Sequence, residues 1–213
     1  MSKSEAKAFK GVTGRTPNQK KFIQTVNEYE IILCDCSLGT GKTYLAVGLA
    51  CEYLIKGKVD KIVMARTSRH LIKEFGFHPG TWEQKSIAMF DQAVEYFIRF
   101  LGKQQFEKMW ADRTIEFTST SIIRGRSLYR TFFIGEEMQE MNKEDWILTL
   151  SRLDKESTFL AIGDRWQNGG NEGFFGRLFD NIDDEAVGKV QMGEEDVQRN
   201  KHIFRICKKI REI

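Results

Sequence analysis

A short polar loop carries the residues whose chemistry is easiest to interpret. Gly39, Thr40 and Gly41 lead directly into Lys42 and Thr43. In such a loop the backbone N–H groups of small residues surround a phosphate, a lysine reaches its outer oxygens, and a hydroxyl takes one position on Mg²⁺. The sequence therefore predicts a phosphate-binding loop. The expected nucleotide contacts are Ser37, Leu38, Gly39, Thr40, Gly41, Lys42 and Thr43.

The segments on either side of this loop have the character that it needs. The apolar run Ile31–Cys34 is typical of a strand that is buried on both faces. After Tyr44 the apolar residues follow helical spacing as far as Gly57, which is placed like a residue that ends a helix. We therefore expect a strand, the loop, and a helix whose N-terminus points at an anion. The alternative is a glycine-rich turn that binds nothing.

One position departs from the usual Gly-x-x-x-x-Gly-Lys-Ser/Thr pattern of such loops. Cys36 stands where the pattern has its first glycine. A cysteine fits there only if the backbone does not require a positive φ angle. The substitution therefore bears on the geometry of the loop and on its affinity for nucleotide.

A second apolar run, residues 131–135, is followed at once by Glu136 and Glu137. The carboxyl ends of parallel strands meet at one edge of a sheet, where ligands bind. A P-loop enzyme needs one acid there to hold Mg²⁺ through water and another to orient or deprotonate the attacking water. We predict that Glu136 holds the metal together with Thr43 and that both glutamates are catalytic; the alternative is a charged loop.

Polar groups also follow two more predicted strands. Residues 158–162 lead to Gln167, which could sense the terminal phosphate from the same sheet edge. Residues 61–65 lead to Arg66 and Arg69, which could hold phosphates or a nucleic-acid backbone. A merely solvated loop explains these two arginines equally well.

Two further arginines, Arg124 and Arg126, flank a glycine shortly after a predicted strand at 114–118. The arrangement suits contact with phosphate and is also common in plain turns. The candidate nucleic-acid residues are thus Arg66, Arg69, Arg124 and Arg126.

The N-terminal region divides near residue 16. Residues 1–15 are polar, and we expect them to form a flexible arm. Thr16 is placed to cap a helix that has Pro17 at its first position. Gln19 lies in the first turn, where a solvated helix residue is the simplest interpretation.

Composition sets outer limits on the protein. The 213 residues have a net charge of +3, with many charges of both signs, which permits a basic patch but does not predict one. The four cysteines lack metal-site spacing, no disulfide framework is expected, and Cys34 and Cys36 are too close in sequence to bridge comfortably. No apolar run approaches the roughly 20 residues of a membrane span, and the N-terminus does not resemble a signal peptide. A reducing cytoplasm is the simplest compartment.

Strands and helices alternate along the chain. Helices are expected at 83–101, at 146–153 and in the basic segment after residue 200, where isoleucines share one face. The alternation predicts an α/β fold with a mostly parallel sheet and helices on both sides.

Taken together, a set of motifs resembles, in order, that of the PhoH-like proteins. The motifs are Thr-Pro-Asn-Gln at 16–19, Gly-Thr-Gly-Lys-Thr at 39–43, Gly-Phe-His-Pro-Gly at 76–80, Arg-Gly-Arg at 124–126, Glu-Glu-Met-Gln at 136–139, Gly-Asp-Arg-Trp-Gln at 163–167 and Asp-Val-Gln-Arg at 196–199. The ordered set covers nearly the whole chain from Thr16 and is far more specific than any single motif. It implies one RecA-like P-loop NTPase domain over residues 16–213, similar to one lobe of a superfamily-one helicase.

The resemblance also implies roles for single residues. ATP with Mg²⁺ is the expected ligand, with Gln19 reading the adenine and Lys42 and Thr43 serving the phosphates and the metal. Glu136 and Glu137 stand where the family has Asp-Glu.

By the same resemblance Gln167 is a phosphate sensor and Arg199 an arginine finger or a nearby sensor. Glu136 is one methylene longer than the family aspartate, and Cys36 replaces a family glycine; both touch the phosphate site, which favours slow turnover.

Three functions compete at this point. The first is an ATPase that couples hydrolysis to the binding or remodelling of RNA or single-stranded DNA. The second is a regulatory or scaffold protein that holds ATP with little turnover. The third, a P-loop kinase, is weaker because no arginine-rich lid segment follows the last strands. One lobe alone leaves the nucleotide open on one side, so we expect a homo-oligomer, by resemblance a ring of six. The compact chain fits a short, phage-type member of the family.

Overall fold

The computed structural model describes residues 11–67, 89–167, 173–198 and 201–211. Its centre is a six-stranded sheet with the strand order β3-β2-β4-β5-β1-β6, in which every pairing is parallel. The strands are β1 (Ile31–Cys36), β2 (Lys61–Arg66), β3 (Ile115–Ser119), β4 (Thr131–Glu136), β5 (Thr158–Gly163) and β6 (Val187–Met192). The expected α/β fold with a parallel sheet is confirmed.

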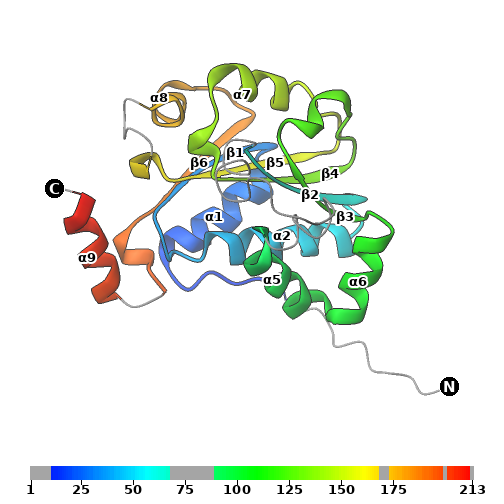
Figure 1. The fold of residues 1–213 in the computed structure, drawn as a ribbon, viewed down its shortest axis with the longest axis horizontal. Coiled ribbons are helices and arrows are strands. Elements are labelled where there is room, and N and C mark those ends of the chain that lie inside the picture. Colours follow the sequence, from blue (N-terminus) through cyan, green and yellow to red (C-terminus); the bar gives the residue numbers. More distant parts are fainter. Residues whose placement is uncertain (1–10, 68–88, 168–172, 199–200, 212–213) are drawn as a thin grey trace, which may run out of the picture.

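Helices cover both faces of this sheet (Figure 1). The described α-helices are α1 (Pro17–Glu28), α2 (Lys42–Ile55), α5 (Asp91–Leu101), α6 (Lys103–Ala111), α7 (Lys143–Leu150), α8 (Phe174–Asn181) and α9 (Lys201–Arg211). Short 3₁₀ turns follow several strands: η1 (Ile122–Gly125), η2 (Met138–Glu140), η3 (Arg165–Gln167) and η5 (Glu194–Asp196). Within the described residues, no helix combines the length and apolar character that crossing a membrane requires.

Alternation along the strands produces two separate cores. Ile32 and Cys34 of β1 face the core between the sheet and helices α1, α2 and α5. Leu33 faces the core on the other side of the sheet, which α7 and α8 cover. Since successive side chains of a strand point to opposite faces, strands buried on both sides need apolar residues at nearly every position. This is why β1, β2, β4 and β5 consist largely of apolar residues.

Local signals account for several helix boundaries. The Thr16 side chain accepts a hydrogen bond from the Gln19 backbone N–H at 3.2 Å, and Pro17 occupies the first helical position, as expected. The helix predicted for 83–101 ends at Leu101, because Gly102 adopts a φ of 82° and α6 begins after it. Residues 83–88 lie outside the described part of the chain.

Two parts of the fold were not foreseen. β6 pairs with β1 as an edge strand of the sheet, and its glycine, lysine and glutamine interrupt the apolar pattern that marks the other strands. Residues 11–15, assigned above to a flexible arm, include Val12, which is buried in the core against Gly48 of α2.

The expectation that Cys34 and Cys36 do not bridge is wrong, because the structure joins them in a disulfide. They lie two residues apart on β1, so both side chains point to the same face of the sheet. Their Cα atoms are 5.8 Å apart, within the range that disulfides span. Closeness in sequence is therefore no obstacle on an extended strand.

Candidate active site

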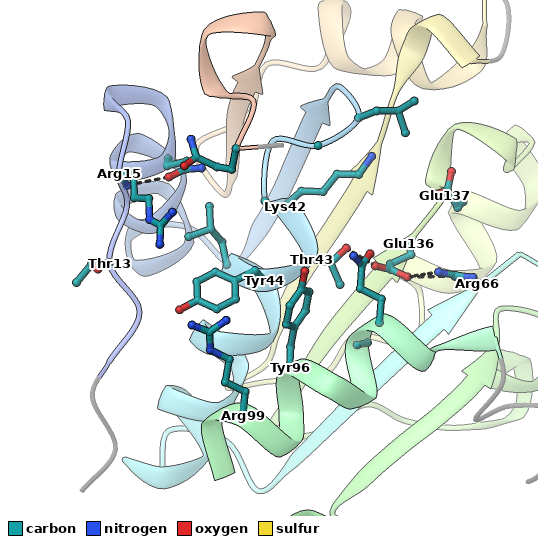
Figure 2. Close-up of a pocket in the computed structure, with 18 residues that line it drawn as sticks. Thr13, Arg15, Lys42, Thr43, Tyr44, Arg66, Tyr96, Arg99, Glu136 and Glu137 are labelled. Atoms are coloured by element: carbon teal, nitrogen blue, oxygen red, sulfur yellow. Dashed lines mark hydrogen bonds and ion pairs between the residues drawn. The ribbon is translucent and has the colours of Figure 1, made fainter. Parts of the chain in front are cut away.

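A pocket of about 350 Å³ opens at the carboxyl edge of the sheet, above the start of α2 (Figure 2). Its walls come from the segment before α1, from the predicted phosphate loop, from α5 and from the ends of β2 and β4. The lining residues are Thr13, Arg15, Gln19, Leu38, Gly39, Gly41, Lys42, Thr43, Tyr44, Leu45, Arg66, Gln92, Ala93, Tyr96, Arg99, Glu136, Glu137 and Gln198. Most of the residues predicted to contact nucleotide are among them.

The loop after β1 has the backbone geometry of an anion site. Gly39 and Gly41 adopt φ angles of 77° and 82°, which only glycine takes readily. The buried Thr40 donates from Oγ1 to the Ser37 carbonyl oxygen at 2.9 Å and so fixes the turn. α2 begins at Lys42, whose Nζ donates to the Cys36 carbonyl oxygen at 3.0 Å. The loop thus holds a helix N-terminus and an ammonium group together, as phosphate binding requires.

Cys36 fits this loop without strain. It is the last residue of β1, paired with Met192 of β6. An extended strand position suits a residue with a Cβ atom, whereas a positive φ angle would favour glycine. The departure from the usual loop pattern is therefore compatible with the backbone.

Thr43, Glu136 and Arg66 form a connected cluster at the phosphate end of the pocket. The Thr43 hydroxyl donates to Glu136 Oε1 at 2.7 Å. Arg66 donates to Glu136 Oε2 from Nε at 3.1 Å and from Nη2 at 2.8 Å. A hydroxyl and a carboxylate are the hard oxygen donors that Mg²⁺ prefers, so these side chains suit the ion. Figure 2 shows Arg66 on the far side of Glu136 from Thr43.

The second acid, Glu137, has an unusual backbone. Its φ and ψ angles of 55° and 37° are left-handed, a conformation that costs a residue with a Cβ atom about 1 kcal/mol. Its carboxylate accepts from Gln139 Nε2 at 2.7 Å and lines the pocket. Gln139 Nε2 also lies 3.4 Å from Gln167 Oε1, and Gln167 Nε2 donates to Asp164 Oδ2 at 3.0 Å. The predicted sensor is therefore connected to Glu137 through one side chain, although it does not line the pocket itself.

A buried ion pair ties the phosphate loop to the sensor segment. Asp35, beside Cys36, accepts from the Arg165 backbone N–H at 3.1 Å and from Arg165 Nε at 2.6 Å. Gln191 donates to the same carboxylate at 3.1 Å. Burial alone would lower the pKa of Arg165, but Asp35 and Asp180 raise it. The ends of β1 and β5 are thus locked together next to the pocket.

The other end of the pocket is aromatic and basic. The Tyr44 ring lies 5.4 Å from the Tyr96 ring, edge to face, and the Arg99 guanidinium lies 5.4 Å from the Tyr44 centroid. Gln19 is buried; its Nε2 donates to the Thr40 carbonyl oxygen at 2.9 Å, and its Oε1 accepts from the Arg15 backbone N–H at 2.8 Å. Gln19 is therefore a positioned pocket residue and not a solvated one.

The C-terminal motif folds back onto both the first helix and the phosphate loop. Asp196 is fully buried and accepts hydrogen bonds from the Thr16 hydroxyl and, at 3.0 Å, from Asn18 Nδ2. The Gln198 backbone N–H donates to the Gly39 carbonyl oxygen at 2.9 Å. The pocket is thus completed by residues from opposite ends of the chain.

The candidate nucleic-acid arginines do not gather on one surface in the described residues. Arg66 lines the pocket, whereas Arg126 binds Glu116, with Nη2 to Oε2 at 2.8 Å, outside the pocket lining. Arg69, the Arg124 side chain and Arg199 lie outside the part of the chain that is described.

Sequence reasoning missed several of these residues. Tyr44 directly follows Thr43, and this position was the one available signal. Tyr96 and Arg99 lie one helical turn apart on α5, but nothing in the sequence says that α5 packs over α2. The Asp35–Arg165 pair joins residues 130 apart in the chain.

Comparison with known proteins agrees with this geometry. A family model described as PhoH-like protein matches residues 11–211. A PhoH-like protein of Mycobacterium leprae is 27% identical over 92% of this chain and 58% of its own length. Protein PhoH of Escherichia coli K12 is 26% identical over 89% of this chain and 55% of its own length. The chain therefore spans little more than half of these curated relatives.

Solved structures share the fold at low sequence identity. The large terminase of a thermophilic bacteriophage has a TM-score of 0.58 at 12% identity, covering 91% of this chain and 49% of the terminase. The Hef helicase domain of Pyrococcus furiosus has a TM-score of 0.51 at 14% identity, covering 84% and 39%. The RecA-like P-loop domain expected from sequence is confirmed.

Proposed function

The chain belongs to the PhoH-like protein family, and on that premise we propose that it is an Mg²⁺-dependent ATPase that couples hydrolysis to RNA or single-stranded DNA. The observation that carries this proposal is the Thr43–Glu136 hydrogen bond of 2.7 Å beside the glycine-bearing loop. It brings together the two side chains from which a P-loop enzyme holds its metal.

Each side chain has a defined task in this proposal. The loop N–H groups and Lys42 bind the phosphates, and Thr43 and Glu136 would hold Mg²⁺, which supplies positive charge to the transferred phosphoryl group. Glu137 orients and deprotonates the attacking water, and the Gln139–Gln167 contact gives that region a connection to the sensor segment. Gln19 lies at the base end, with one N–H of its amide left to read adenine.

The test is steady-state phosphate release from ATP and Mg²⁺, with and without single-stranded RNA or DNA. Lys42→Ala should reduce release by about a hundredfold or more, since it removes a charge that stabilises the transition state. Lys61→Ala is the matched control. This lysine binds Glu116 near the amino ends of the strands, on the side of the sheet opposite the pocket. Equal rates for both variants would refute the ATPase assignment.

The coupling of ATP hydrolysis to nucleic acid is the more specific part of the proposal. A rise in phosphate release with RNA or DNA would identify the coupled partner. Absence of both binding and stimulation would reduce the proposal to a plain ATPase.

A specific observation favours a second candidate, a nucleotide-holding scaffold. Both oxygens of Glu136 are engaged by Thr43 and Arg66 within the chain, an arrangement that would slow turnover. Bound ATP without released phosphate, together with unchanged cellular phenotypes of Glu137→Gln, would establish this alternative.

We also propose a homo-oligomer, six subunits in a ring, in which a neighbour closes the pocket and Arg199 acts across the interface as an arginine finger. The support is that one lobe supplies one wall of such a site in helicases. Sedimentation that shows a monomer with full ATPase activity would refute it.

A further inference from the structure

Arg66 is placed in an unexpected environment. As the last residue of β2 it was a candidate for nucleic-acid contact, yet its guanidinium lies inside the pocket and binds Glu136 Oε2 through two N–H groups. Charge-assisted hydrogen bonds of this kind are roughly twice as strong as neutral ones.

The sheet itself builds this contact. In the parallel pairing of β2 with β4, Arg66 is the register partner of Glu136. The Arg66 guanidinium also lies over the Phe90 ring, 5.0 Å from its centroid. Because backbone register and ring packing both position the arginine, the pair is part of the fold and not a chance contact between mobile side chains.

The same carboxylate is the predicted metal residue. The Glu136 side chain is only 7% exposed, its Oε1 is bound by Thr43, and its Oε2 by Arg66. A divalent ion next to Thr43 and Glu136 would therefore share the glutamate with an existing positive charge. Two cations at one buried carboxylate repel each other, and burial weakens the solvent screening between them.

We propose that Arg66 is the internal counter-ion of Glu136 and competes with Mg²⁺ for it, so that the chain itself weakens metal binding at its phosphate site. This inference rests on the proposed function, because it takes Thr43 and Glu136 as the metal residues. Arg66 is then a positioning residue: it holds Glu136 beside Thr43 and sets the affinity for the ion.

The test measures metal affinity directly. Mn²⁺ is titrated into the full chain and the free ion is counted by electron paramagnetic resonance, once with ADP and once without nucleotide. Arg66→Gln should lower the dissociation constant for Mn²⁺ by about tenfold or more, as expected for the loss of one nearby positive charge. Arg66→Lys keeps the charge and should stay within about threefold of wild type.

The matched control is Arg130→Gln. Arg130 binds the carboxylates of Asp60 and Glu156 at the amino end of β4, the strand whose other end carries Glu136. Its removal should leave the Mn²⁺ affinity unchanged.

A second variant keeps the test decisive if Arg66→Gln does not fold. Glu136→Asp shortens the side chain by one methylene, so that it cannot reach Thr43 and Arg66 together, and Mn²⁺ should again bind several-fold more tightly. A purely structural role for Arg66 predicts the opposite, because a loosened Glu136 would bind metal less well. Unchanged or weaker Mn²⁺ binding in Arg66→Gln or Glu136→Asp would overturn the proposal.

Binding of a fluorescent ADP analogue is measured separately, with Mg²⁺ and in EDTA. If the analogue binds to wild type under neither condition, the proposed function fails, while the nucleotide-free Mn²⁺ titrations still decide the role of Arg66.

Discussion

The two ends of β4 carry similar chemistry in different surroundings. At the amino end Arg130 binds Asp60 at 2.8 Å and also Glu156, with carboxylate side chains that are 67% and 56% exposed. At the carboxyl end Arg66 binds Glu136, which is 7% exposed. Exposed pairs of the first kind contribute about 0–1 kcal/mol to stability. The free-energy cost of taking two charges out of water is often larger than the gain from their attraction. A buried pair at a ligand-binding edge therefore points to a role other than stability.

The Asp35–Arg165 pair gives the largest test of this contrast. Asp35→Asn removes the buried one of the two carboxylates that balance the Arg165 guanidinium, the other being the half-exposed Asp180, and we expect the free energy of unfolding to fall by about 3 kcal/mol. Asp60→Asn, at the amino edge, should cost less than about 1 kcal/mol. Urea unfolding of both variants measures the two values, and equal losses would show that burial does not separate the two edges.

Glu137 tests the contrast in activity. Glu137→Gln should lower phosphate release by about a hundredfold, as for a lost catalytic base, while nucleotide binding persists. Glu156→Gln removes an acid from the amino edge and should leave release unchanged. Similar rates for the two variants would mean that Glu137 does not act on the attacking water.

Glu116 is intermediate in burial between Glu136 and the exposed carboxylates of Asp60 and Glu156. Burial alone would raise its pKa, but hydrogen bonds from Arg126 and Lys61 lower it from 4.5 to about 2. A carboxyl group whose pKa is lowered by folding stabilises the folded state at pH values above its ordinary pKa. This contribution is lost as the pH falls from near 4.5 toward 2. Between these pH values wild type should lose about 1 kcal/mol more than Glu116→Gln. Thermal unfolding across that range measures the difference, and parallel curves would contradict the assigned ion pairs.

Cys36 should give the smallest effect. In reducing buffer, where the Cys34–Cys36 disulfide is open in wild type as well, Cys36→Gly should cost about 1 kcal/mol or less of stability, because the position lies in a strand. In reducing buffer its nucleotide affinity should stay close to that of Cys36→Ser. A large gain in affinity with glycine would show that the loop is distorted by the cysteine.

At the carboxyl edge of the sheet, the functional residues that are consecutive in sequence could be predicted. The loop 39–43 and the pair Glu136 and Glu137 each follow an apolar run, so strand and site are read together. Arg66 was recognised as a polar strand end, but its partner was not, because that depends on β2 lying beside β4. No sequence pattern specifies which strands are neighbours.

The remaining differences have similar causes. β6 was not predicted because an edge strand with one partly polar face has little apolar signal. Tyr96 and Arg99 were hidden because an amphipathic helix indicates that one face is buried and not what lies beneath it.

The contact of Asp196 with Thr16 has a consequence for how the protein is made. The cap of α1 and the Gly39 carbonyl oxygen find their partners 180 and 159 residues further along the chain. Contacts of such long sequence separation form late, because a large loop must close before they stabilise anything. On the ribosome the phosphate loop is synthesised early but gains its last wall only after Gln198 has emerged. The pocket therefore gains the last wall that its own chain supplies only after all six strands of the sheet have been synthesised.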